Sequence, residues 1–197
     1  MDENVAFYLN VMKQICPEYS DKELQDFGQG LYSKSYPKKT EVFGLNQTHN
    51  TIGFIVKGLA RSYYITPKGE DKTAWYIKEN DFITDYPAFL NESKSNYIFE
   101  TIAPSVIVFL PKKVIDESYK KSITNQKYGR LIAEQIIQRM QKRIESFLFL
   151  SAKERYLHFV EENKDLVNKI SIKDMASIIG IERQSLTRLR KQLLNEK

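Results

Sequence analysis

The stretch Ser171-Ile-Lys-Asp-Met-Ala-Ser-Ile-Ile-Gly180-Ile-Glu-Arg-Gln-Ser-Leu-Thr-Arg-Leu-Arg190 predicts two short helices joined by a tight turn. Ser171 suits the N-cap of the first helix, whose apolar residues recur at helical spacing: Ile172, Met175, Ala176 and Ile179. Gly180 falls where the chain must turn sharply between the two helices. Glycine suits this position because it accepts a positive φ at the least cost. This combination is typical of a helix-turn-helix.

One face of the predicted second helix is basic and polar. Arginine and glutamine can form paired hydrogen bonds with guanine and adenine edges, which suits a DNA major groove. We expect base contacts from three residues that project together: Arg183, Gln184 and Arg188. We expect phosphate contacts from a second set: Ser171, Lys173, Ser185, Thr187, Arg190 and Lys191. The simpler alternative is a helical hairpin with a solvated basic face.

Charge is distributed unevenly along the 197 residues, whose net charge is +5. Residues 1–117 hold 13 Lys and Arg against 16 Asp and Glu, whereas residues 118–150 hold 7 against 2 and residues 151–197 hold 10 against 7. The basic excess therefore lies in the C-terminal part, which indicates that this end approaches a polyanion. A hydrophobic content of 42% argues for packed domains rather than a disordered basic protein.

The composition also excludes several chemistries. A single cysteine, Cys16, rules out an internal disulfide and a four-thiolate metal site, and the two histidines, His49 and His158, form no metal-spaced pair. No nucleophile motif or phosphate-binding glycine loop occurs, so the sequence predicts no metal, no cofactor and no enzyme. The apolar runs are too short to span a bilayer and the N-terminus lacks a signal-peptide pattern, so we expect a cytoplasmic protein without membrane contact.

The N-terminal part predicts two helices followed by an all-β region. Residues 3–16 and 20–30 have helical patterns, the second opened by a capping box between Ser20 and Glu23. Short β-branched and aromatic runs then indicate six strands, at residues 31–36, 52–56, 59–65, 73–77, 97–101 and 106–110. Many short strands at hairpin spacing fit a small double-sheet jelly roll or barrel.

A long helix is predicted over residues 118–150, which contain no proline and a single glycine. Its apolar residues follow one another at spacings of four and three, as along a coiled-coil seam: Ala133, Ile137, Met140, Ile144 and Phe147. We expect this seam to join two copies of the chain; the alternative is that it packs on the chain's own β region. A further capping box, at Ser151 and Glu154, opens a helix over residues 152–162 that leads into the helix-turn-helix.

The predicted fold class is therefore α+β. N-terminal helices and a double-sheet jelly roll occupy residues 1–117, a long central dimerisation helix residues 118–150, and a helix-turn-helix domain residues 151–197.

This order of parts resembles the Crp/Fnr family of bacterial transcription regulators. Residues 54–64 (FIVKGLARSYY) are similar to the family's strand–glycine–strand hairpin, residues 79–83 (ENDFI) to the lead into its ligand loop, and residues 181–189 (IERQSLTRL) to its recognition helix. The resemblance implies a homodimer that binds a two-fold symmetric DNA operator. It also implies that the β domain senses an unknown small-molecule effector and that RNA polymerase is a further partner.

The sensor half departs from the cyclic-nucleotide-binding members of that family. Those members follow Phe-Ile with Gly-Glu and later use an Arg that neutralises the cyclic phosphate, whereas here Thr84 and Asp85 follow Phe-Ile and the Arg position falls near Ser95. Without a guanidinium, a buried phosphate loses a charge-assisted bidentate contact, so we expect that cAMP is not a ligand.

A pocket for a different effector would have seven predicted wall residues: Tyr63, Tyr76, Thr84, Asp85, Tyr86, Tyr97 and Phe99. Aromatic residues at strand spacing are more commonly core residues.

The leading prediction is a homodimeric, sequence-specific DNA-binding transcription regulator with a sensor β domain that does not bind cAMP. The main alternative is a ligand-binding or interaction module of the same fold without DNA-binding function. The basic cluster argues against this alternative: Arg183, Arg188, Arg190 and Lys191. A jelly-roll enzyme of the cupin type would need clustered histidine and carboxylate ligands, which the sequence lacks.

Overall fold

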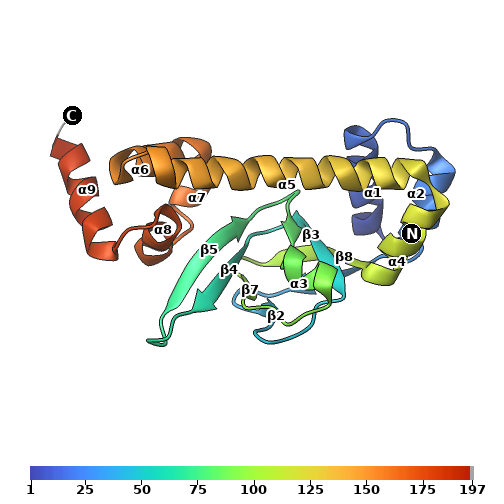
Figure 1. Ribbon diagram of the computed structural model, residues 1–197, viewed down its shortest axis with the longest axis horizontal. Coiled ribbons are helices and arrows are strands. Elements are labelled where there is room, and N and C mark those ends of the chain that lie inside the picture. The colour runs from blue at the N-terminus through green and yellow to red at the C-terminus, as the bar shows by residue number, and fades with distance from the viewer. Residues whose placement is uncertain (196–197) are drawn as a thin grey trace. The chain divides into compact units, whose positions relative to one another are not determined.

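The computed structural model describes residues 1–195, which divide into two compact units (Figure 1). The first unit comprises Met1–Asp71 and Trp75–Ile132, and the second comprises Lys72–Ala74 and the chain from Ala133 onward. Strands and helices are both present, so the α+β class predicted from the sequence is confirmed.

Two four-stranded antiparallel sheets form the predicted jelly roll (Figure 1). One sheet has the strand order β1, β8, β3, β6: Tyr32–Tyr36, Ser105–Pro111, Thr51–Lys57 and Phe82–Ile83. The other has the order β2, β7, β4, β5: Glu41–Phe43, Ile98–Thr101, Ala60–Ile65 and Asp71–Ile77. Strands that are adjacent in these sheets are mostly distant in the sequence, as in a double-sheet jelly roll rather than a simple meander.

The sequence pattern misses three short elements of the first unit. β2 and β6 are three and two residues long, too short to show an alternation of apolar and polar side chains. The helix α3, Tyr86–Asn91, is also missed; it has six residues, Asp85 as its N-cap and a proline in its first turn.

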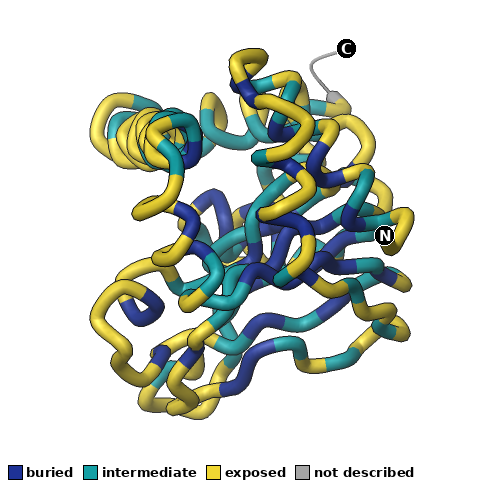
Figure 2. The backbone as a smooth tube through the Cα atoms, turned by 90° about the vertical axis from the view of Figure 1, so that its right-hand side faces the viewer, coloured by how far each residue is buried: buried dark blue, intermediate teal, exposed yellow. Residues whose placement is uncertain are grey.

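Apolar side chains from both sheets meet in a buried core. Ile55, Ile83 and Ile107 are fully buried there, and Phe99 joins them from the second sheet. The strands β4 and β7 alternate between buried and more exposed positions, whereas β3 and β8 have runs of consecutive buried residues; Figure 2 colours buried positions dark blue. In β4 and β7 this alternation fixes the register, because a slip of one residue would turn the buried set outward.

The N-terminal helix α1, Glu3–Ile15, covers one end of this unit with a second apolar cluster. Tyr8 and Met12 are fully buried in it. The ring of Tyr8 lies 4.7 Å from that of Phe54 on β3, measured between centroids. Burying side chains of this size contributes about 2–3 kcal/mol each, which accounts for the attachment of α1 to the sheet.

The predicted helix over residues 118–150 is two helices: α4, Lys112–Lys121, and α5, Ile123–Phe149. The chain is extended at Ser122, with φ −145° and ψ 129°. The Ser122 hydroxyl accepts hydrogen bonds from the backbone N–H groups of Thr124 and Asn125 and donates one to Glu23. The single-helix prediction was therefore wrong at its N-terminal end, because Ser122 caps a new helix.

Buried hydroxyl groups hold the first turns of α5 within this unit. The Tyr19 hydroxyl donates to Asn125 Oδ1 over 2.7 Å, and the hydroxyls of Tyr8 and Tyr128 lie 3.3 Å apart. Glu23 lies on α2, Asp21–Gly28, where it completes the predicted capping box with Ser20. Hydrogen bonds from Ser122 and Ser20 lower the pKa of Glu23 to about 2, so it stays ionised at neutral pH.

The second unit contains, besides the rest of α5, four helices in its described part. They are α6 Ala152–Glu162, α7 Lys164–Val167, α8 Ile172–Ile179 and α9 Arg183–Asn195. The predicted capping box at Ser151 and Glu154 is present at the start of α6. Met175 on α8 and Leu186 on α9 are fully buried and form the centre of the helix-turn-helix.

The turn between β3 and β4, which leads from one sheet to the other, generates the first prediction. Gly58 has a φ of +109°, and a Cβ built on it would lie 2.6 Å from the carbonyl oxygen of Pro104. We expect Gly58→Ala to lower the free energy of unfolding by about 3 kcal/mol, from backbone strain and steric overlap together. The measurement is a urea titration followed by the fluorescence of Trp75, the single tryptophan.

Gly69→Ala is the matched control. Gly69 has a φ of +79° but nothing within 4 Å of an added Cβ, so only the strain of about 1 kcal/mol should appear. Equal losses in the two variants would show that the close approach to Pro104 is unimportant.

Candidate functional site

The turn between α8 and α9 has the geometry that the sequence predicts. The Ser171 hydroxyl accepts a hydrogen bond from the N–H of Asp174 over 3.0 Å and caps α8. Gly180 adopts a φ of +71°, and the N–H of Ile181 donates to the carbonyl of Ala176 over 3.0 Å. This six-to-one hydrogen bond closes the end of α8 as in a Schellman motif, and the chain then turns directly into α9.

The α9 side chains predicted to contact DNA are mostly exposed. Leu186 is fully buried and holds one face of α9 against the unit. Exposed residues surround it in the sequence: Arg183, Gln184, Ser185, Thr187, Arg188 and Lys191. Arg190 is half-buried. The structure thus presents the predicted base-contacting set, Arg183, Gln184 and Arg188, to the outside on a single helix.

Two of the predicted phosphate contacts already have hydrogen-bond partners within the chain. Ser171 donates to the carboxylate of Asp174 over 2.7 Å, and Thr187 donates to the carbonyl of Arg183 over 3.0 Å. A hydroxyl has one proton to donate, so neither group is ready to donate to a phosphate in this conformation.

One arginine holds the ends of two helices of the second unit. The Nε of Arg155 on α6 donates to the carbonyl of Ile179, the last residue of α8, over 2.8 Å. Its Nη1 donates to the carbonyl of Leu150, just after α5, over 2.7 Å. Carbonyls at helix C-termini lack partners within the helix and carry partial negative charge, so a guanidinium is well suited to both.

The ring of Phe147 packs against this arginine. We use the name Arg155 clamp for the group of four residues Arg143, Phe147, Arg155 and Gly180. The guanidinium carbons of Arg155 and Arg143 lie 5.2 and 5.5 Å from the ring centroid of Phe147. A Cβ built on Gly180 would lie 2.5 Å from the Phe147 ring, so glycine is required here for close packing as well as for its φ. Local sequence patterns do not indicate this role, because Arg155 lies in an ordinary run of charged residues.

The residues of the predicted dimer seam are exposed along α5, except that Ala133 is half-buried and Phe147 also has a packing role within the chain. Ile137, Met140 and Ile144 have exposed fractions of 63%, 48% and 60%, and Ala133 is half-buried. Phe147 belongs instead to the Arg155 clamp, although 42% of its surface remains exposed. Leu148, which the seam prediction omitted, is 69% exposed and lies one residue further along the helix.

In the first unit, Asp85 and Ser95, two positions at which the sequence departs from the cyclic-nucleotide binders, form a hydrogen bond with each other. Asp85 Oδ2 accepts a hydrogen bond from the Ser95 hydroxyl over 2.8 Å. Asp85 Oδ1 accepts from the N–H of Ala88 and so caps α3. The Ser95 hydroxyl also accepts from the N–H of Tyr97 over 3.0 Å, and Ser95 is fully buried.

The other predicted pocket residues face different surroundings. Tyr63 lies on the opposite face of β4 from the buried Ser62 and stacks with Arg61, whose guanidinium carbon is 4.4 Å from the ring. Phe99 and Tyr76 are buried, the former in the core between the sheets. Tyr86 stacks on Phe89. The buried Thr84 hydroxyl has no hydrogen-bond partner among residues 1–195.

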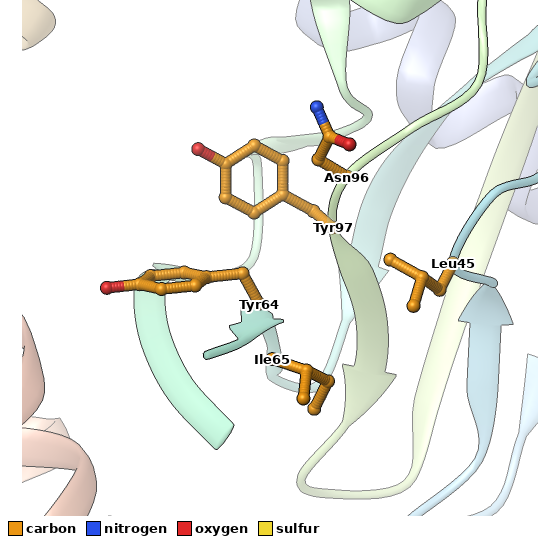
Figure 3. Close-up of a pocket in the computed structure, with 5 residues that line it drawn as sticks. All are labelled: Leu45, Tyr64, Ile65, Asn96 and Tyr97. Atoms are coloured by element: carbon orange, nitrogen blue, oxygen red, sulfur yellow. The ribbon is translucent and has the colours of Figure 1, made fainter. Parts of the chain in front are cut away.

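Tyr97 lines a shallow depression with residues that the prediction omitted (Figure 3): Leu45, Tyr64, Ile65 and Asn96. The rings of Tyr64 and Tyr97 are nearly perpendicular, with centroids 6.4 Å apart. Tyr64 rather than Tyr63 thus shares a face with Tyr97. The strand pairing decides this, since Tyr63 pairs with Ile98 on β7, and composition alone could not.

His49 is a buried packing residue. Its ring stacks on Phe43 with centroids 4.5 Å apart, and burial lowers its pKa, so it is neutral at physiological pH. Among residues 1–195 no three acidic, histidine or cysteine side chains gather so that they could hold a metal ion. Within the same range no helix is long and apolar enough to cross a membrane.

Comparison with known proteins identifies others with a similar architecture. Residues 33–122 match the model of the cyclic nucleotide-binding domain family. CLP, the c-di-GMP-responsive global regulator of Xanthomonas campestris, superposes with a TM-score of 0.71 at 14% identity, over 90% of this chain and 93% of that one. A Crp/Fnr transcriptional regulator of Thermus thermophilus superposes with a TM-score of 0.68 at 16% identity, over 84% and 87%.

The chain has the fold of the Crp/Fnr regulators. The resemblance found in the sequence is confirmed at this level. The catabolite activator protein of Thermus thermophilus shares the Crp/Fnr fold more loosely, with a TM-score of 0.57 at 13% identity, over 92% of this chain and 87% of that one. No curated protein sequence matches the chain.

The Arg155 clamp generates the second prediction. Arg155→Ala leaves two helix-terminal carbonyls without their partner and removes a cation–π contact, so the free energy of unfolding should fall by about 2–3 kcal/mol. Arg155→Lys should lose most of this as well, because an ammonium cannot bridge both carbonyls in the same way. Thermal unfolding followed by far-ultraviolet circular dichroism, which reports on the helices, measures the effect.

Lys142→Ala, at an exposed position of α5, is the control and should change stability by less than about 0.5 kcal/mol. If Arg155→Ala were no more destabilising than Lys142→Ala, the clamp would not hold the unit together.

Proposed function

We propose that the chain is a homodimeric, sequence-specific DNA-binding transcription regulator with a sensor β domain that does not use cAMP. The observation that carries the proposal is the pair of faces on α9. Leu186 is fully buried on one, while Arg183, Gln184 and Arg188 are exposed. A helix held this way can enter a major groove without unfolding any part of its own unit.

The exposed residues of α9 divide by chemistry into two sets. Arg183, Gln184 and Arg188 can form bidentate hydrogen bonds with base edges, arginine favouring guanine and glutamine favouring adenine. Lys191, Arg190 and Lys173 on α8 supply charge for phosphates. The hydroxyls of Ser171 and Thr187 are occupied within the chain, so we expect the charged residues to account for most of the salt dependence.

The seam on α5 supports the homodimer. Ile137, Met140 and Ile144 have exposed fractions between 48% and 63% on one helix, at spacings of three and four residues. Because Phe147 is engaged by the Arg155 clamp, we expect Leu148 to extend the seam in its place. A second copy of the chain would cover this stripe by the same residues from both sides, as a two-fold axis requires.

The sensor loop supports the exclusion of cAMP. The carboxylate of Asp85 faces Ser95, where cyclic-nucleotide binders of this fold have an arginine, and the sequence holds no Arg between Arg61 and Arg130. A carboxylate without a nearby guanidinium repels a phosphate. The effector, if it is a small molecule, is therefore of another class; RNA polymerase is the further partner that a transcription regulator would need.

The third prediction concerns association. Ile137→Glu combined with Met140→Glu should give monomers with weakened DNA binding, because charges would be buried in the seam. Sedimentation velocity at about ten micromolar distinguishes the two states, a concentration at which seams of ordinary affinity are occupied. The control is Gln138→Glu, an exposed neighbour outside the seam, which should remain dimeric. A monomeric parent protein under these conditions would contradict the seam.

The fourth prediction separates base contacts from phosphate contacts. Arg188→Ala should weaken binding to a selected operator by roughly 1–3 kcal/mol and leave binding to random duplex nearly unchanged. Lys191→Ala should weaken both DNAs alike and lower the slope of log affinity against log salt by about one. Binding of both variants to both DNAs across a salt series is the measurement.

Each possible failure of this test has a distinct meaning. If Arg188→Ala weakened both DNAs equally, Arg188 would be a phosphate contact and α9 would be rotated in the groove. If the parent protein selected no operator from a random library, the regulator proposal itself would be wrong.

A further inference from the structure

We propose that Ser95 is a built-in ligand for Asp85, which keeps the loop from Ser93 to Tyr97 closed without any diffusible molecule. The inference rests on the sensor role proposed above and describes how that site is regulated.

Every polar group of Ser95 is engaged. Its N–H donates to the carbonyl of Gln47 over 3.0 Å, and its carbonyl accepts from the N–H of Asn46 over 2.9 Å. Its hydroxyl donates to Asp85 and accepts from the N–H of Tyr97. Ser95 is fully buried, so breaking these hydrogen bonds would leave polar groups unpaired and shielded from solvent.

The Asp85 carboxylate is occupied as well. One oxygen accepts from the Ser95 hydroxyl and the other from the N–H of Ala88 at the start of α3. A charge-assisted hydrogen bond from a hydroxyl is stronger than a neutral one, so this pair is the firmest point of the loop. Each oxygen keeps a further lone pair, but the hydroxyl contact that a ligand would offer is already made by Ser95.

A neighbouring segment pairs with the loop and shields it. Residues 46–48 run beside residues 94–95, through the two backbone hydrogen bonds of Ser95 and a bridge between Thr48 and Lys94. The side chain of Gln47 in turn accepts from the N–H of Gly44, which fixes the turn that brings this segment into place. The loop is thus closed from both sides by the chain itself.

This loop therefore differs from a loop that becomes ordered only when a ligand binds. In a site that a ligand completes, the loop is loose until the ligand supplies the missing hydrogen bonds. Here those hydrogen bonds are made by Ser95, and the carboxylate of Asp85 disfavours an anionic guest. A signal that acts on this loop must therefore break the Ser95 contacts rather than complete them.

Hydrogen–deuterium exchange of the full chain tests the proposal. In Ser95→Ala the amides of Asn46, Ser95 and Tyr97 should exchange at least about tenfold faster than in the parent, the effect expected from losing one or two net hydrogen bonds. Ser93→Ala, an exposed serine of the same loop, is the control and should exchange like the parent. Millimolar cAMP should leave the exchange of the parent unchanged.

Two results would overturn the proposal. One is unchanged amide exchange in Ser95→Ala. The other is further protection of these amides by cAMP, which would show that a bound nucleotide orders the loop. Should Ser95→Ala fail to fold, judged by Trp75 fluorescence, Asp85→Asn replaces it and should accelerate exchange at Ala88 and Tyr97. Ser95→Thr, which retains a hydroxyl, should restore most of the protection.

The test is independent of DNA binding. If the protein selected no operator but Ser95→Ala opened the loop, the regulator proposal would fail and the built-in ligand would stand. If the protein selected an operator but Ser95→Ala left the loop unaffected, the regulator proposal would stand and the built-in ligand would fail.

Discussion

The guanidinium of Arg155 is the contact on which the second unit depends, since it joins parts that the backbone alone leaves independent. It donates to the carbonyl of Ile179 at the end of α8 and to that of Leu150 just after α5. Each helix end would otherwise have unpaired carbonyls carrying partial negative charge. Phe147 lies between this arginine and Gly180, so charge, ring and turn are positioned together.

Local patterns predicted the helix-turn-helix well. The cap at Ser171, the left-handed Gly180 and the inward Leu186 are set by residues within a few positions of one another, and all three are present. Contacts between distant residues escaped prediction. The role of Phe147 depends on Gly180, more than thirty residues later, and its spacing in α5 is equally compatible with a seam. The break at Ser122 likewise depends on Glu23, about a hundred residues earlier.

The loop around Ser95 shows the same limit of local sequence patterns. The absence of an arginine near Ser95 is visible in the sequence, but its pairing with Asp85 is not, because ten residues and a short helix separate them. Strand register had a similar effect on the aromatic residues. Tyr63 and Tyr64 are indistinguishable by composition. Tyr63 shares a face of β4 with Arg61, two residues away, whereas pairing with β7 places Tyr64 near Tyr97. The chemical types of the residues in the first unit were thus easier to predict from the sequence than the directions in which their side chains point.

The clamp also has a consequence for the length of DNA that two copies would span. Because Arg155 ties α8 directly to the end of α5, the angle of α9 relative to α5 is set inside each subunit before any DNA is present. In a dimer joined along α5, the separation of the two reading helices would then be a fixed dimension of the protein. Half-sites would have to lie about 34–36 Å apart, one turn of B-DNA, or a multiple of it. Inserting or deleting a few base pairs between them would turn one half-site away from its helix, and the protein could not follow.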